Sequence, residues 1–156
     1  MLLGVSPYIL EIRPNHLITT FKTMKKSGKK PWQVAFVLYF MLLFLIVITA
    51  NGGNLPYNFL GKIPNYDIYG HFILYGIASF LSHLALVGKK IIIDQIFIPL
   101  GPFLLTLVTI AEEISQIYLP HRTFSIVDLN ASLIGIILFY YLAELWIFYH
   151  KKRLRE

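Results

Sequence analysis

The stretch YDIYGHFILYGIASFLSHLALVG, residues 66–88, is long and apolar enough to form a helix that crosses a membrane. Its first third nevertheless carries Asp67, His71 and Tyr75 at four-residue spacing. On an α-helix these residues share one face, with successive members about 6 Å apart along the axis. Ionisable side chains are costly in hydrocarbon, so the stripe predicts that this helix faces a partner, a cavity or water at that level.

The composition of the whole chain indicates an integral membrane protein. The chain has 156 residues, of which 56% are hydrophobic and 14% are charged. A soluble domain carries about 25% charged residues, so the deficit is large. Cysteine is absent from the sequence, which excludes disulfides, thiolate metal sites and cysteine nucleophiles.

Four apolar segments have the length of a membrane span, which is about 20 residues. They cover residues 32–50, 68–87, 100–119 and 126–148. The third belongs to a longer apolar block, residues 91–119, in which Pro99 and Pro102 flank Gly101. We therefore expect a kink or a short interfacial segment there, followed by a continuous helix that starts near Pro102. The sequence predicts an all-α fold, a four-helix transmembrane bundle.

Lysine and arginine fix the expected orientation of the bundle. All of the 14 lysines and arginines except Lys62 and Arg122 flank the same ends of the spans. By the positive-inside rule, both termini are expected on the cytoplasmic side. Residues 1–30 then form a basic, mildly amphipathic cytoplasmic segment, residues 31–149 the membrane domain, and residues 150–156 a basic tail. Topology and anionic lipid headgroups account for the net charge of +6, so we expect no nucleic-acid partner.

The third and fourth spans carry polar stripes that end at the same, outer level as the first stripe. In the third span Glu113 and Gln116 share a face, and Glu112 lies about 100° away from it. In the fourth span Asp128 and Ser132 share a face. The predicted cluster joins the three stripes with the arginine of the last loop: Asp67, His71, Tyr75, Glu113, Gln116, Arg122, Asp128 and Ser132.

Members of this cluster also have a purely structural interpretation. Asp67 and Asp128 would serve as helix N-caps. Arg122 would reach the headgroups by snorkelling, and His71 would hydrogen-bond a neighbouring helix. A carboxylate at Glu113 inside the membrane boundary needs a cation or a raised pKa, and His71 or Arg122 is the expected partner. We favour a functional polar site, because ionisable residues inside a membrane usually face a partner, a cavity or water.

The other polar residues of the spans are expected to be structural. His83 lies near the cytoplasmic end of its span, on another face, and is expected to pack against a neighbour. Asp94 and Glu144 are expected to cap or to snorkel. The second span carries the smallest side chains and is therefore expected to be the central, closely packed helix: Gly70, Gly76, Ala78, Ser79 and Ser82.

The polar spacing resembles that of a known family. DIYGHFILY, followed by EEISQIYLPHRTFSIVDLNASLIG, is similar to the VanZ-like family of small bacterial membrane proteins. That family shows Asp–x3–His–Phe–x2–Tyr, then Glu–x2–Gln, an arginine in a short loop, and Asp–x3–Asn–x2–Gly. The matching positions are Asp67, His71, Phe72, Tyr75, Glu113, Gln116, Arg122, Asp128 and Gly135, and the family's asparagine falls at Ser132.

The resemblance implies an envelope-associated protein in the inner, plasma-type membrane of a bacterium. The family is named for low-level resistance to teicoplanin, a lipid-bearing glycopeptide that acts on cell-wall precursors outside the membrane. We therefore expect a protein that binds or modulates a membrane lipid or a lipid-linked envelope precursor, with Arg122 holding a phosphate or carboxylate.

Two other functions stay open from the sequence. One is an intramembrane acid–base enzyme, in which His71 and Glu113 are the candidate catalytic residues and water, Ser125 or Ser132 is the nucleophile. The other is an accessory subunit of a larger membrane complex. We expect no cofactor and no metal site, because a metal needs three or four ligands and the outer side offers two histidines.

Overall fold

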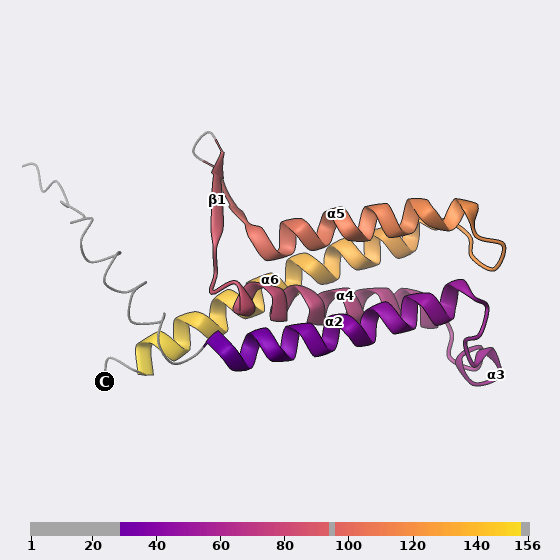
Figure 1. The fold of residues 1–156 in the computed structure, drawn as a ribbon, viewed down its shortest axis with the longest axis horizontal. Helices are drawn as coiled ribbons and strands as arrows, with labels where there is room; N and C mark the ends of the chain where they lie inside the picture. The colour runs from indigo at the N-terminus through magenta and orange to yellow at the C-terminus, as the bar shows by residue number, and fades with distance from the viewer. Residues whose placement is uncertain (1–28, 94–95, 154–156) are drawn as a thin grey trace, which may run out of the picture.

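The computed structural model describes residues 29–93 and 96–153, and four long helices dominate this part of the chain (Figure 1). Each of the four is long and apolar enough to cross a membrane, which confirms the predicted candidate spans. They are α2 (Lys29–Asn51), α4 (Tyr66–Ala85), α5 (Leu100–Ser115) and α6 (Ile126–Arg153). The short helix α3 (Tyr57–Leu60) follows α2, and the 3-10 turn η1 (Gln116–Tyr118) continues α5. The predictions for residues 1–28, Asp94 and residues 154–156 lie outside the described residues.

The ends of the helices differ from the predicted ones by a few residues, for local reasons. α4 ends at Ala85 because Val87 and Gly88 both adopt left-handed backbone angles, with φ of 58° and 65°. The N–H of Gly88 then bonds the carbonyl of His83 at 2.9 Å and closes the helix end. α6 continues beyond the predicted residue 148 to Arg153, and its last turn is basic, which favours the negative end of the helix dipole.

The four helices lie side by side and alternate in direction along the chain (Figure 1). α2 and α5 run one way, and α4 and α6 run back, so α4 and α6 are parallel to each other. We call the end of the bundle that holds the α5–α6 loop the Arg122 end. The opposite end, where the chain passes from α4 to α5, is the Lys90 end.

The register between α4 and α6 is constant along their length. His71 lies opposite Ser132 near the Arg122 end, and His83 lies opposite Glu144 near the Lys90 end. Both pairs are separated by 61 positions in the sequence. The two pairs lie 12 residues apart on each helix, which is about 18 Å along the helix axis. The helices are therefore parallel and keep the same register over this distance.

Helix α4 is the centre of the bundle, as its small side chains predict. It contacts α2, α5 and α6, and its span is the most buried of the four. At Gly135 of α6, a Cβ atom would collide with the backbone carbonyl of Phe72 in α4. At Gly101 of α5, a Cβ atom would lie 2.8–3.0 Å from Ser82 of α4. Close approach of backbones is the usual reason for small residues between membrane helices.

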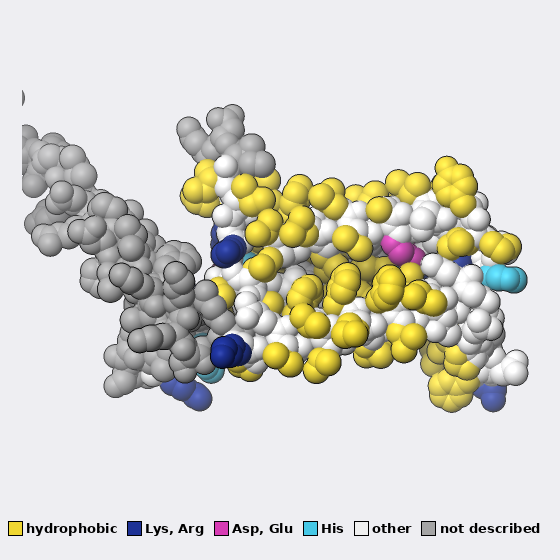
Figure 2. Space-filling view, in the orientation of Figure 1, with side chains coloured by type: hydrophobic (Ala, Val, Ile, Leu, Met, Phe, Trp, Pro, Cys, Tyr) yellow, Lys and Arg dark blue, Asp and Glu magenta, His cyan; other side chains and the backbone are white. Residues whose placement is uncertain are grey.

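The core is a layer to which every span contributes. Its buried members are Leu43 of α2, Tyr75 and Ala78 of α4, Leu105 of α5 and Ile136 of α6. Large apolar side chains cover the outside of the bundle instead, and Figure 2 shows them over most of one flank. Lysine and arginine gather at the ends of the bundle in the same view. This inverted distribution is what a bilayer requires of a bundle of spanning helices.

The structure is mostly helical, and the segment between α4 and α5 adds a short β-hairpin to the predicted helices. Strands β1 (Lys90–Ile93) and β2 (Ile96–Pro99) form an antiparallel hairpin, where a kink or a short interfacial segment is predicted. Isoleucine occupies three of the four positions of β1 and two of the four positions of β2. Such β-branched residues favour extended backbone over helix. Pro99 is also extended, with φ −68° and ψ 119°, and the continuous helix starts one residue later.

An added side chain at position 135 is expected to destabilise the bundle, because the carbonyl of Phe72 belongs to a helix backbone and cannot move aside. Overpacking of this kind costs about 1–3 kcal/mol. We expect Gly135→Ala in detergent to melt below the unmodified protein when unfolding is followed by tryptophan fluorescence. Gly70→Ala is the matched control in α4, since a Cβ there meets nothing within 4 Å. Equal melting temperatures for the two variants would contradict the close α4–α6 contact.

Candidate functional site

A cavity of about 210 Å³ lies at the Arg122 end, mainly between α2 and α4. Its wall on the α2 side is apolar and consists of Leu43, Ile46, Val47 and Ala50. The connection after α2 adds Leu55 and Leu60. The facing wall contains Gly70 and Leu74 of α4 and brings together polar side chains from α4, α5 and the α5–α6 loop: Tyr66, Asp67, His71, Tyr75, Glu112 and Arg122.

Four of the eight residues predicted for the polar cluster line this cavity. They are Asp67, His71, Tyr75 and Arg122. Among the other four, Glu113, Gln116 and Ser132 are buried and lie outside the lining, and Asp128 is half-buried at the start of α6. The cluster therefore has two parts, one that faces the cavity and one that joins helices.

His71 and Tyr75 of α4 each contact a polar side chain of a different neighbouring helix. The Nδ1 atom of His71 lies 3.1 Å from the hydroxyl of Ser132, which is fully buried on α6. The hydroxyl of Tyr75 donates to Oε2 of Glu112 on α5 at 3.0 Å. The His71 and Tyr75 rings stack with centroids 5.7 Å apart. The polar stripe of α4 is thus hydrogen-bonded to both α5 and α6.

Glu112 is the residue that the sequence interpretation missed. Its position about 100° from the stripe of Glu113 and Gln116 suggested that it faced elsewhere. In the structure it lines the cavity and accepts hydrogen bonds from Tyr75 and, at 2.9 Å, from the carboxamide of Gln116. The i,i+4 spacing of Glu112 and Gln116 is the pattern that could have revealed it, because such residues are neighbours on a helix.

Glu113 joins α5 to the start of α6. Its Oε1 atom accepts the backbone N–H of Ser125 at 2.8 Å, and Gln116 donates to its Oε2 at 3.2 Å. The prediction that His71 or Arg122 pairs with this carboxylate is wrong in the described part of the chain, where these two donors serve instead. The backbone of the α5–α6 loop supplies the hydrogen bond that the buried carboxylate needs.

The two aspartates differ from their predicted capping role. Ser125 precedes α6, and its hydroxyl accepts the N–H of Asp128 at 3.2 Å, which is the geometry of an N-cap serine. Asn65 occupies the cap position of α4, with φ 55° and no capping side-chain hydrogen bond. Asp67 and Asp128 instead lie in the first turns, where a carboxylate favours the positive end of the helix dipole.

Arg122 approaches the cavity from the loop. Its Nε donates to Oε1 of Gln116 at 3.3 Å, so the guanidinium is held in place by a neutral carboxamide. The ion pairs found in the described residues involve neither Arg122 nor any carboxylate of the cavity. Among the described residues, this half-buried guanidinium therefore has no carboxylate within ion-pair distance.

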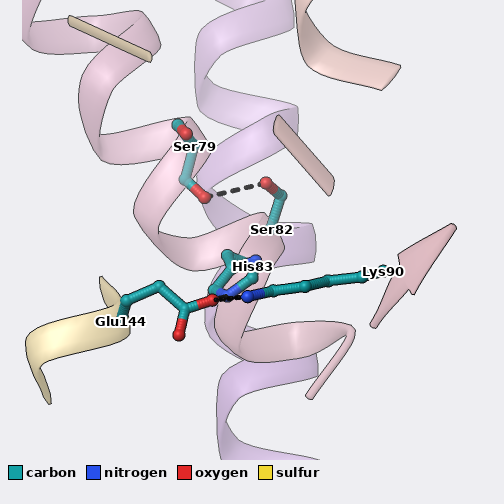
Figure 3. A network of polar contacts seen from close by, with 5 residues as sticks. All are labelled: Ser79, Ser82, His83, Lys90 and Glu144. Atoms are coloured by element: carbon teal, nitrogen blue, oxygen red, sulfur yellow. Dashed lines mark hydrogen bonds and ion pairs between the residues drawn. The ribbon is translucent and has the colours of Figure 1, made fainter. Parts of the chain in front are cut away.

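A second polar cluster, the Lys90 cluster, lies at the other end of the bundle (Figure 3). Oε1 of Glu144 lies 2.9 Å from Nζ of Lys90 and 3.0 Å from Nε2 of His83. His83 is fully buried, and its ring packs edge-on against Tyr140 with centroids 5.0 Å apart. The hydrogen bond to the Glu144 carboxylate raises the pKa of the Lys90 amine. The packing role expected of His83 omits this link between α4, α6 and the hairpin.

Comparisons with known proteins found no similar family, protein or structure. Protein-family models, curated proteins and solved structures all gave no match. Within the described residues, no three histidine, aspartate or glutamate side chains are grouped so that they could hold a metal ion. The resemblance to the VanZ-like family therefore stays a prediction from the motifs quoted above.

Removing the Glu113 carboxylate is expected to loosen the junction between α5 and α6. Glu113→Ala leaves the N–H of Ser125 without its acceptor, and loss of a hydrogen bond to a charged group costs about 1.5–3 kcal/mol. We expect a clear drop in melting temperature in detergent. Ile114→Ala on the same helix is the control, because that side chain is 47% exposed on the outside of the bundle. A Glu113→Ala variant as stable as the Ile114→Ala variant would contradict the assigned role.

Proposed function

We propose that the cavity at the Arg122 end binds the phosphate-bearing headgroup of a membrane lipid or of a lipid-linked envelope precursor. The observation that carries this proposal is an arginine that has no ion-pair partner among the described residues and lines a cavity with one apolar wall and one wall of mixed polar and apolar side chains. A phosphate would satisfy Arg122, and His71 would add a hydrogen bond.

The apolar wall of α2 supports an amphiphile over a free anion. Leu43, Ile46, Val47 and Ala50 face the polar residues across the cavity, so the first carbons of an acyl or isoprenoid chain have apolar neighbours. A cavity of about 210 Å³ is smaller than the roughly 300–1,000 Å³ of sites that enclose a drug-sized ligand. A headgroup with the start of its chain fits this size, and the remaining chain would lie among the lipids.

The carboxylates of the cavity refine the proposed headgroup. Asp67 and Glu112 lie in the same lining as Arg122, so the formal charges there are two negative and one positive. An anion alone would be repelled by this excess, whereas a headgroup that carries both a phosphate and an ammonium group matches it. We therefore expect phosphatidylethanolamine to bind more tightly than phosphatidylglycerol.

The proposed setting follows the distribution of basic residues. Because all lysines and arginines except Lys62 and Arg122 lie on one side of the spans, we place both termini in the cytoplasm and the cavity in the outer leaflet. The resemblance to the VanZ-like family supports a bacterial inner membrane and a role in the cell envelope. A contribution to glycopeptide resistance and membership of a larger membrane complex stay predictions.

An acid–base enzyme has one observation in its favour, the contact of 3.1 Å between His71 and Ser132. Ser132 is fully buried and does not line the cavity, so a substrate there would not reach its hydroxyl. Glu113 is held by Ser125 and Gln116 and is not hydrogen-bonded to His71 in the described part of the chain. Binding without turnover fits this geometry better.

Native mass spectrometry of the detergent-extracted protein tests the proposal. Phosphatidylethanolamine, phosphatidylglycerol and a polyisoprenyl pyrophosphate are added separately, so that a phospholipid and a lipid-linked precursor are distinguished. We expect Arg122→Ala to weaken binding of the preferred lipid by roughly 10- to 100-fold, as the loss of charge-assisted hydrogen bonds predicts. Lys62→Ala is the control, because Lys62 is an exposed cation at the same end that does not line the cavity. Unchanged binding in Arg122→Ala, or equal losses in both variants, would refute the site.

A further inference from the structure

The hairpin of β1 and β2 is apolar and exposed on both faces. Ile92 and Phe97 are a direct cross-strand pair on one face, and each is 65% exposed. On the other face Ile96 is 66% exposed and Ile91 is 36% exposed. An isolated two-stranded hairpin is marginally stable in water even when one face is polar. Exposed apolar strands also attract other chains, so this hairpin needs an apolar cover.

The hairpin stands crosswise to the four helices at the Lys90 end (Figure 1). A structure that leaves the end of a bundle of spanning helices at this angle runs along the membrane surface instead of into the hydrocarbon. Its open strand edges carry unpaired N–H and C=O groups, which the hydrocarbon core does not accept. The headgroup layer provides water for the edges and acyl chains for the side chains.

An ion pair at the base of the hairpin links it to the helices. Nζ of Lys90, the first residue of β1, lies 2.9 Å from Glu144 of α6, and the same carboxylate oxygen contacts buried His83 of α4 (Figure 3). The N–H of Leu100, the first residue of α5, bonds the carbonyl of Lys89 at 2.9 Å and closes the base of the hairpin. The ion pair of Lys90 with Glu144 therefore links β1 to α6, and β2 continues directly into α5.

The charges at this end match an acidic lipid surface. Lys89 and Lys90 lie at the foot of the hairpin, and Lys151, Lys152 and Arg153 end α6. Among the described residues at the Lys90 end, the carboxylate is that of Glu144, and it is paired with Lys90. Each cation close to an anionic membrane surface adds to the attraction.

We infer that the hairpin is an interfacial membrane element. It lies in the headgroup layer at the Lys90 end, with the Ile92–Phe97 face against the acyl chains and the neighbouring cations at acidic lipid headgroups. This surface is separate from the cavity at the Arg122 end, so it does not depend on the function proposed for that cavity. A second copy of the chain, paired edge to edge with the strands, is the competing occupant.

Depth measurements with spin labels test this inference. The chain has no cysteine, so Ile92→Cys and Phe97→Cys each give one labelling site, and Lys152→Cys is the exposed control. The labelled full-length protein is reconstituted in vesicles of phosphatidylethanolamine and phosphatidylglycerol. Collisions of the nitroxide with oxygen, which concentrates in the bilayer, are compared with collisions with a water-soluble nickel chelate. Unchanged melting temperatures show that the labelled variants are folded.

We expect oxygen collisions to exceed nickel collisions at residues 92 and 97, and the order to reverse at residue 152. Nickel collisions in excess at residues 92 and 97 would place the hairpin in water and overturn the inference. Shielding from both reagents, with dipolar broadening between labels on two chains, would assign the hairpin to a second copy and overturn it as well.

Discussion

The contact between α4 and α6 is the constraint on which the rest of the structure depends. Gly135 allows the backbone of α6 to approach the carbonyl of Phe72 so closely that no side chain fits between them. Ser79 strengthens the same contact with a hydrogen bond to the carbonyl of Ile136 at 2.8 Å. With the helices parallel and in one register, His71 meets Ser132 at one end and His83 meets Glu144 at the other. One packing contact thus sets two polar clusters at different levels of the membrane.

The two clusters serve the bundle differently because they lie at opposite ends of it. At the Arg122 end, hydrogen bonds from Tyr75 to Glu112 and from Arg122 to Gln116 hold these two side chains in the wall of the cavity, which would preorganise the site for the proposed headgroup. At the Lys90 end, Glu144 ties buried His83 to the first residue of the hairpin. At both ends, polar side chains hydrogen-bond to partners from another segment, and such bonds are stronger in a low-dielectric surrounding.

The sequence predicts the spans well because length and hydropathy decide them. It also predicts the central place of α4 from small residues, and the convergence of His71, Tyr75 and Arg122 on one level from helical spacing.

The partners of these residues depend on how the helices rotate about their axes. Neither spacing nor composition contains that rotation, so helical spacing places Glu112 off the site and predicts partners for Glu113 that differ from Ser125 and Gln116. The pairing of His83 with Glu144 could have been found from the 61-residue offset, once α4 and α6 are known to be parallel. The hairpin is not predicted, because a short run of isoleucines is compatible with a strand as well as with the start of a span.

Chemical cross-linking of cysteine pairs measures the parallel register most directly, and the absence of native cysteine makes each pair unambiguous. The account predicts that a short thiol-reactive cross-linker joins the pair His71→Cys with Ser132→Cys, and also the pair His83→Cys with Glu144→Cys. The crossed pairs, 71 with 144 and 83 with 132, are about 18 Å out of register and should stay unlinked. Efficient linking of the crossed pairs would mean antiparallel α4 and α6, and it would contradict both the four-span bundle and the sites built on it.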